Sequence, residues 1–268
     1  MSPLVALLLG IVEGLTEYLP VSSTGHLILV SALFGLHDDG SKAFDIVVQL
    51  GAILAVVLHY RGLLAERARG LLAREPVALR LLTCLFLGFL PSALLGLAFG
   101  KIIKAKLFAP LPVAIALFVG GVLMIIVERL PRREVPVIDR LSDVTPRHAI
   151  WVGLGQCLAL FPGTSRSMST IVAGRLVGLT PAVAAELSFL LALPTLGAAT
   201  LYELAKSYRV FLSPGALSPL VIGLVASFFT AWLVVATFLQ VLNRIGLLPF
   251  GVYRIALAVV VVVATLHG

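Results

Sequence analysis

Charged residues are scarce in this sequence. Only 12% of its 268 residues are Asp, Glu, Lys or Arg, whereas 60% are apolar, and the mean hydropathy is +1.10. A soluble domain needs a larger polar share to cover its surface. The composition therefore excludes an ordinary soluble protein. It predicts an all-α polytopic membrane protein that forms a single integral membrane domain over residues 1–268.

Cysteine is also rare. Cys84 and Cys157 lie in apolar stretches, without the spacing of a metal site or a disulfide framework, so we expect both to be small core residues. The N-terminus lacks a basic region and a cleavage pattern, so we expect no removable signal peptide. The net charge of +7 comes from Arg and Lys in short connections between apolar runs. This pattern orients a membrane protein and does not indicate nucleic-acid binding.

The apolar runs fall into two length classes. Two of them, 3–36 and 149–179, are interrupted by a Pro-Val-Ser-Ser-Thr-Gly and a Pro-Gly-Thr-Ser-Arg-Ser segment. Their apolar arms of roughly 10–14 residues are too short to cross a bilayer and suit re-entrant helix–loop–helix hairpins. Six others are long enough to cross a membrane, which takes roughly 20 residues: about 43–60, 81–100, 110–127, 182–205, 217–242 and 249–267.

The two halves of the chain share a pattern that predicts an internal repeat. We interpret it as repeat 1 (about 1–128), a connecting cytoplasmic loop (about 129–148) and repeat 2 (about 149–268). Each repeat holds one hairpin and three spans, so the second copy must be inverted, and inverted repeats place broken helices face to face near the bilayer midplane. The matching residues are Gly10, Glu13, Pro20, Ser23 and Asp45 in the first half and Gly153, Gln156, Pro162, Ser165 and Glu186 in the second.

Loop charges predict an orientation. Eleven arginines fall on one face against six basic residues on the other, which favours the first face as cytoplasmic. The first hairpin would then enter from outside, and insertion in both orientations is the alternative. The first face carries Arg61, Arg67, Arg69, Arg74, Arg80, Arg129, Arg132, Arg133, Arg140, Arg147 and Arg244, and the second carries Lys42, Lys101, Lys104, Lys106, Lys206 and Arg209.

Two carboxylates stand out in the first hairpin. Glu13 and Glu17 are four residues apart and share one helix face. Where solvation is poor they repel, so either one keeps a proton or the pair binds a cation. General acid–base chemistry or a hard divalent ion, Mg²⁺ or Ca²⁺, fits this pair, and a hydrogen-bonded structural pair is the alternative. Nothing indicates an organic cofactor.

A hydroxyl-rich segment follows these carboxylates. Ser22, Ser23 and Thr24 come just after Pro20, where a new helix should begin. A hydroxyl can cap that helix while free N–H groups bind a phosphate. His26 lies three residues beyond Ser23, in reach to accept its proton or to attack phosphorus itself. A structural hydrogen bond is the alternative role of the histidine.

The second polar segment centres on Arg166. A guanidinium at membrane depth costs about 2.5–3.5 kcal/mol on insertion scales and needs an anionic partner. Its forked donors suit phosphoryl oxygens, and a structural salt bridge to Glu13, Glu17 or Glu186 is the alternative. The neighbouring residues that add backbone and hydroxyl donors to a phosphate cradle are Gly163, Thr164, Ser165 and Ser167.

These motifs resemble those of the bacterial undecaprenyl-diphosphate phosphatase family, of the bacitracin-resistance type. The resemblance covers essentially the whole chain, with one departure: Asp45 stands where the family leads us to expect Glu. It rests on Glu13-x-x-x-Glu17, Pro20-Val-Ser-Ser-Thr-Gly-His26, Phe44-Asp-Ile-Val-Val-Gln-Leu-Gly-Ala-Ile-Leu-Ala, Pro162-Gly-Thr-Ser-Arg-Ser167 with Thr170, and Glu186-Leu-Ser-Phe-Leu-Leu-Ala-Leu-Pro194.

The resemblance implies a function. Such an enzyme removes the terminal phosphate of a C55 polyprenyl diphosphate, which regenerates the lipid carrier for peptidoglycan synthesis and confers bacitracin resistance. It lies in the bacterial inner membrane with its site open to the outside. By motif, the resemblance places Glu13 and Glu17 in the acidic motif of the family, Ser22, Ser23 and His26 in its active-site turn, and Ser165 and Arg166 in its phosphate-binding turn. From the residues themselves we expect Ser23, His26, Glu17 and Arg166 to be catalytic, with Glu17 orienting the histidine or sharing a cation with Glu13, and Thr170 to be among the substrate-binding residues.

Several alternatives stay open at the level of sequence. Either Ser23 or His26 is the nucleophile, a metal-activated water competes with both, and the oligomeric state is undetermined, a homodimer included. A secondary transporter or flippase of a lipid phosphate or small anion is the rival function, because inverted repeats with broken helices are also transporter architecture.

Overall fold

The computed structural model describes residues 1–36, 38–107, 109–130 and 137–267, and this part of the chain is helical. Of the predicted connecting loop, residues 131–136 lie outside the described residues. Within the described ranges the only β contact is an isolated bridge between Ile138 and Leu179. The elements are α1 (Pro3–Thr16), α2 (Ser23–Leu33), α3 (Asp39–Val47), α4 (Gln49–His59), α5 (Arg61–Leu72), α6 (Pro76–Leu107), α7 (Pro110–Arg129), η1 (Leu141–Asp143), α8 (Pro146–Gln156), η2 (Cys157–Leu160), α9 (Arg166–Leu176), α10 (Pro181–Phe211), α11 (Leu217–Ile245) and α12 (Leu248–His267).

Six helical segments of the described chain are long and apolar enough to cross a membrane. The six predicted spans are therefore confirmed, and their bounds lie within a few residues of the predicted limits. The first is formed by α3 and α4 together, and the others by α6, α7, α10, α11 and α12. Their bounds are Asp39–His59, Pro76–Gly100, Pro110–Arg129, Pro181–Phe211, Leu217–Ile245 and Leu248–Leu266.

Two pairs of short helices interrupt this series. Helices α1 and α2 have 14 and 11 residues, and α8 and α9 have 11 each. All four are shorter than the roughly 20 residues of a membrane span, which agrees with the lengths expected for two hairpins. Their re-entrant course through a bilayer and the inverted relation of the two repeats stay predictions.

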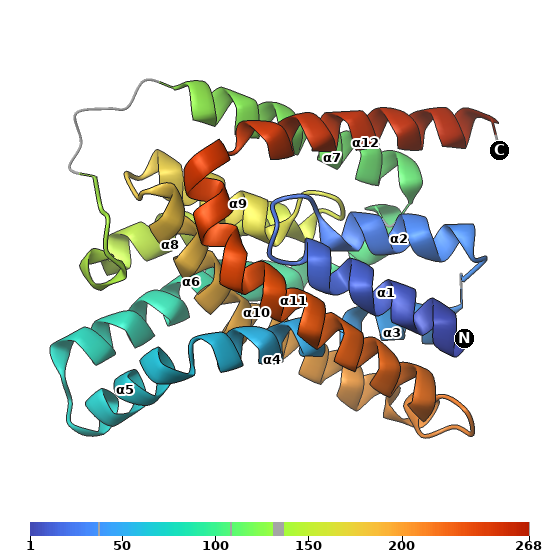
Figure 1. Ribbon diagram of the computed structural model, residues 1–268, viewed down its shortest axis with the longest axis horizontal. Helices are drawn as coiled ribbons and strands as arrows, with labels where there is room; N and C mark the ends of the chain where they lie inside the picture. The colour runs from blue at the N-terminus through green and yellow to red at the C-terminus, as the bar shows by residue number, and fades with distance from the viewer. Residues whose placement is uncertain (37, 108, 131–136, 268) are drawn as a thin grey trace.

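Small residues let the short helix α1 pack closely against the long helix α11. A Cβ added at Gly10 would collide with the carbonyl oxygen of Gly223 on α11, and one at Gly14 with Thr230 of the same helix. Glycines four residues apart allow such close helix contact in membranes. Helix α12 lies alongside α7 in the same way (Figure 1), since Gly121 and Gly251 face each other's backbone.

Helix α10 runs through the middle of the protein. Leu187, Phe189 and Leu190 are fully buried in the largest apolar cluster, and α10 contacts α3, α4, α6, α9 and α11. A polar residue on this stretch, Ser188, is therefore sealed from solvent at 0% exposure. The enclosed helix brings that hydroxyl to the polar site described next.

Candidate active site

The two interrupted apolar runs form two turns of similar shape. Residues 17–22 are the first turn and residues 161–165 the second. Each ends in a serine with positive φ, 75° at Ser22 and 76° at Ser165. Ser22 Oγ accepts the Gly25 N–H at 3.2 Å and Ser165 Oγ accepts the Met168 N–H at 3.2 Å. The predicted hydroxyl cap after Pro20 is therefore confirmed and falls on Ser22.

This geometry changes how the two halves correspond. The sequence pattern pairs Ser23 with Ser165, but the cap position pairs Ser22 with Ser165 and Ser23 with Arg166. The difference arises because the second turn holds one more residue between its proline and its cap. The extra length includes Gly163, with φ +91°, where an added Cβ would lie 2.6 Å from the carbonyl oxygen of Val113.

Glu17 joins the two turns. Its Oε2 accepts a hydrogen bond of 2.5 Å from Ser23 Oγ, and its Oε1 accepts one of 2.8 Å from Arg166 Nη2. The side chains of Glu17 and Arg166 are only 5% and 7% exposed, so their attraction is weakly screened. Three of the four predicted catalytic side chains thus meet at one carboxylate, and the salt bridge considered for Arg166 is formed with Glu17.

Further contacts fix the guanidinium of Arg166. Its Nη1 donates to the backbone oxygen and to Oγ of Ser188, at 2.8 and 2.9 Å, and its Cζ lies 5.5 Å from the ring centroid of Tyr18. Thr170 Oγ1 donates to Ser188 Oγ at 2.7 Å. The Nε of Arg166 is buried without a hydrogen-bond partner among the described residues, which leaves this N–H for an anion.

His26 lies close to these groups in sequence but has other partners. Its Nδ1 is 2.7 Å from the carbonyl oxygen of Ser22 and its Nε2 is 2.6 Å from Tyr253 Oη. A carbonyl can only accept, so Nδ1 carries a proton and Nε2 accepts from the tyrosine. The hydroxyl of Ser23 is directed to Glu17 instead of His26. The role of His26 as a base or nucleophile therefore stays a prediction.

Glu13 is the second carboxylate of the predicted pair. It is fully buried, neither oxygen has a hydrogen bond within the described structure, and its charge interacts with those of Glu17 and Asp45. A buried carboxylate next to other acidic side chains must be protonated or bind a cation. No group of three His, Cys, Asp or Glu side chains in the described ranges is placed to hold a metal ion. Mg²⁺ needs only one or two carboxylates when a phosphate supplies further ligands. Glu17 lines the pocket between the turns and Glu13 lies outside that lining, so a cation shared by this pair stays a prediction.

A small polar pocket of about 130 Å³ lies between the turns. Ser167 and Thr170, predicted to bind substrate, point instead into protein contacts: Ser167 Oγ donates to the Leu19 carbonyl at 2.8 Å and Thr170 bonds Ser188. Thr164 faces a neighbouring apolar pocket. The polar pocket is lined by Glu17, Ser22, Ser23, Thr24, Gln49, Ala159, Leu160, Phe161, Pro162, Gly163, Ser165, Arg166 and Leu196.

Sequence reasoning missed Arg254. It lies on α12, is 0% exposed and donates four hydrogen bonds of 2.9–3.3 Å to backbone carbonyls. One acceptor, Pro20, lies in the first turn, and another, Gly163, in the second. A lone arginine inside the predicted span 249–267 was the available signal, because a charge within a span is functional by default. Ser188, Tyr18 and Tyr253 carried no such signal.

Fold and site together define a helical membrane protein with a buried Ser–Glu–Arg cluster held between two helix-capping turns. A family model described as "Bacitracin resistance protein BacA" matches residues 6–260. The chain belongs to this family.

Curated relatives are similar over almost the whole length. A protein of Sorangium cellulosum is 55% identical over 258 residues, covering 96% of this chain and 84% of the relative. One of Aromatoleum aromaticum is 49% identical (96% and 92% covered), and one of Nitrosospira multiformis is 47% identical (98% and 94%). All three are named undecaprenyl-diphosphatase. The apolar helices and these relatives make the chain a multi-pass bacterial membrane protein.

Proposed function

We propose that this protein hydrolyses the terminal phosphate of undecaprenyl diphosphate and releases the lipid monophosphate. The observation that carries the proposal is the position of Glu17, which binds Ser23 and Arg166 at once. A carboxylate in this place can take the hydroxyl proton while a cation stands ready for the phosphoryl oxygens. The similarity to three proteins named undecaprenyl-diphosphatase supports the same substrate.

The geometry supports Ser23 as the nucleophile. Its proton passes to Glu17 as Oγ forms a bond to the terminal phosphorus, and the bond from phosphorus to the bridging oxygen breaks to release the lipid monophosphate. Glu17 gives this proton to the oxygen of the departing lipid monophosphate and is a carboxylate again. It then takes a proton from water, which attacks the phosphorus of the phosphoserine; the bond from phosphorus to Ser23 Oγ breaks, Glu17 returns the proton to Oγ, and inorganic phosphate leaves. Arg166 and the N-termini of α2 and α9 bind the charge of the diphosphate throughout.

A divalent cation is part of the proposal. Glu13, with Glu17 beside it, would hold Mg²⁺ or Ca²⁺ together with the diphosphate, and the bound ion would offset the negative charge that builds up on the phosphoryl oxygens. His26 is retained as the alternative base, at the end of the hydrogen bond from Tyr253.

The test is phosphate release from undecaprenyl diphosphate by the purified protein in detergent, where no compartments exist for transport. We expect release by the wild type, its abolition by Arg166→Ala, and its loss with a chelator if the cation is required. Comparing His26→Ala with Tyr253→Phe separates the two roles of the histidine. If His26 is the base, His26→Ala loses activity and Tyr253→Phe keeps it. Absence of release from folded protein under all ion conditions would favour a transporter.

From the distribution of basic residues in the loops, we propose further that the polar pocket opens to the outside of the inner membrane. Leu72, 89% exposed at the end of the Arg-rich α5, and Leu212, 74% exposed just after α10, provide matched positions on the two faces. In a background without Cys84 and Cys157, Leu212→Cys should react with an impermeant thiol reagent in whole cells and Leu72→Cys should not. The reverse pattern would overturn this orientation, and equal labelling would mean insertion both ways.

A further inference from the structure

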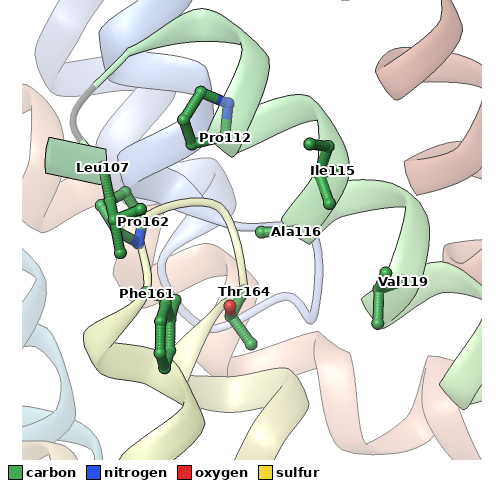
Figure 2. Close-up of a pocket in the computed structure, with 8 residues that line it drawn as sticks. All are labelled: Leu107, Pro112, Ile115, Ala116, Val119, Phe161, Pro162 and Thr164. Carbon is green, nitrogen blue, oxygen red and sulfur yellow. The ribbon is translucent and has the colours of Figure 1, made fainter.

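An apolar pocket of about 360 Å³ adjoins the polar one. Its first wall is one face of α7, formed by Pro112, Ile115, Ala116 and Val119, which are spaced as neighbours on a helix surface. Figure 2 shows the side chains of the second turn opposite this helix. The full lining is Leu107, Pro112, Ile115, Ala116, Val119, Phe161, Pro162 and Thr164.

Two observations connect this pocket to the substrate. Phe161 and Pro162 line both pockets, so the apolar one begins at the wall of the polar one. Its rim lies on the exposed apolar surface of α7, one of the six candidate spans, since Ile115 is 56% and Val119 50% exposed. A pocket of this size lies at the low end of the range for small-molecule sites, about 300–1,000 Å³. It therefore suits a short apolar segment and not a whole C55 chain.

We infer that this pocket binds the isoprene units next to the diphosphate. The inference rests on the proposed hydrolase function. Apolar contacts beside the reacting group recognise the part of the tail that every long-chain polyprenyl diphosphate shares. The remainder of the chain stays in the lipid.

Val119→Trp, which fills the pocket, and Ile126→Trp form a matched pair, because both residues lie on α7 and both are 50% exposed. We expect Val119→Trp to raise KM for a C15 diphosphate by about tenfold with kcat unchanged, and to leave inhibition by tail-free inorganic pyrophosphate unchanged. Ile126→Trp should alter neither. Equal KM values in the two variants would overturn the inferred role of the pocket and leave the proposed function untouched. A wild type that releases no phosphate would overturn it together with the proposed function.

A second inference rests on Arg254. Gly120 makes room for its guanidinium: a Cβ there would collide with Arg254 Nη2. The four hydrogen bonds of Arg254 reach the carbonyls of Pro20, Gly163, Ala116 and Leu117. They tie the first turn, the second turn and α7 to a single side chain.

The structure assigns Arg254 the role of a positioning residue that sets the separation of the two turns, and with it the placement of Ser23 relative to Arg166. Misplacement of catalytic groups by about 1 Å can lower a rate by about 10²-fold. This inference also depends on the proposed hydrolysis. A purely structural role of Arg254 would instead lower the unfolding temperature but leave kcat of the folded enzyme unchanged.

The test compares Arg254→Met, Gly120→Ala and the double variant, each assayed below its unfolding temperature in detergent. We expect kcat to fall by about 10²-fold in either single variant and no further in the double, since both changes remove the same contacts. Arg254→Lys, which keeps the charge and some of the contacts, should recover part of the rate. Wild-type kcat in folded Arg254→Met, or losses that multiply in the double variant, would overturn the inference.

Discussion

The two turns have the same backbone plan but supply different chemistry. In each, a serine with positive φ caps the next helix, and the first residue after the cap reaches Glu17. That residue is Ser23, a neutral hydroxyl, in the first turn and Arg166, a fixed cation, in the second. One repeated backbone frame thus holds a hydroxyl on one side of a carboxylate and a cation on the other.

The difference between the turns follows from their neighbours. The carboxylate belongs to the first turn, so Ser23 has its proton acceptor within its own hairpin. Arg166 instead finds its partners in other segments, on Glu17 and on Ser188 of α10. The second turn is therefore positioned by tertiary contacts, whereas the first carries most of its chemistry locally.

Removing the proposed nucleophile should have the largest effect on this comparison. Ser23→Ala should lower phosphate release by about 10³-fold or more, because no other hydroxyl in the described structure shares the hydrogen bond to Glu17. The control is Ser169→Ala, whose hydroxyl donates to the carbonyl of Ser165, the N-cap of α9, and to no other group in the described ranges. If Ser23→Ala were active and His26→Ala inactive, the nucleophile would be the histidine.

Changing the shared carboxylate tests whether it serves both turns. Glu17→Gln should lower kcat by about 10²–10⁴-fold through loss of the base. It should also destabilise the protein by about 3–5 kcal/mol, because Arg166 is left buried without its counter-charge. Assays and thermal unfolding in detergent measure the two effects. Glu13→Gln is the matched comparison, and we expect it mainly to weaken activation by Mg²⁺; equal loss of kcat in both variants would contradict the special role of Glu17.

Arg166→Lys separates charge from geometry in the second turn. Lysine keeps the cation but cannot bond Glu17 and Ser188 simultaneously in a planar fork. We expect kcat to fall by about 10²–10³-fold, the usual loss when one preorganised donor is removed. Initial rates over a range of substrate concentration provide the check. Wild-type kcat with a raised KM would show that Arg166 binds the ground state only.

The two capping serines should respond alike to substitution if the two turns are equivalent. Ser22→Ala and Ser165→Ala should each cost about 0.5–2 kcal/mol. Ser→Gly at either position should cost less, because glycine adopts positive φ without strain. Thermal unfolding in detergent compares the four variants. A large difference between the turns would show that their similar backbones are held by different forces.

Much of the fold could be read from the sequence because it depends on local composition. Runs of apolar residues gave the six spans, and the two polar interruptions, with Pro20 and Pro162, gave the turns. The match between Ser23 and Ser165 was wrong by one residue because a spacing count cannot detect the additional residue of the second turn. Only the positive φ at Ser22 and Ser165 reveals which positions correspond.

The sequence by itself determined the membrane class, the six spans and the two polar clusters, because hydropathy and the cost of buried charge act on short segments. The tertiary structure alone decided the partners within the site. Arg166 and Glu17 are 149 residues apart in the chain, and Arg254 is 234 residues from Pro20. Hydrogen-bond geometry over such separations is set by how the helices pack, so it directs Ser23 to Glu17 and His26 to Tyr253, although spacing along the chain favours Ser23 with His26.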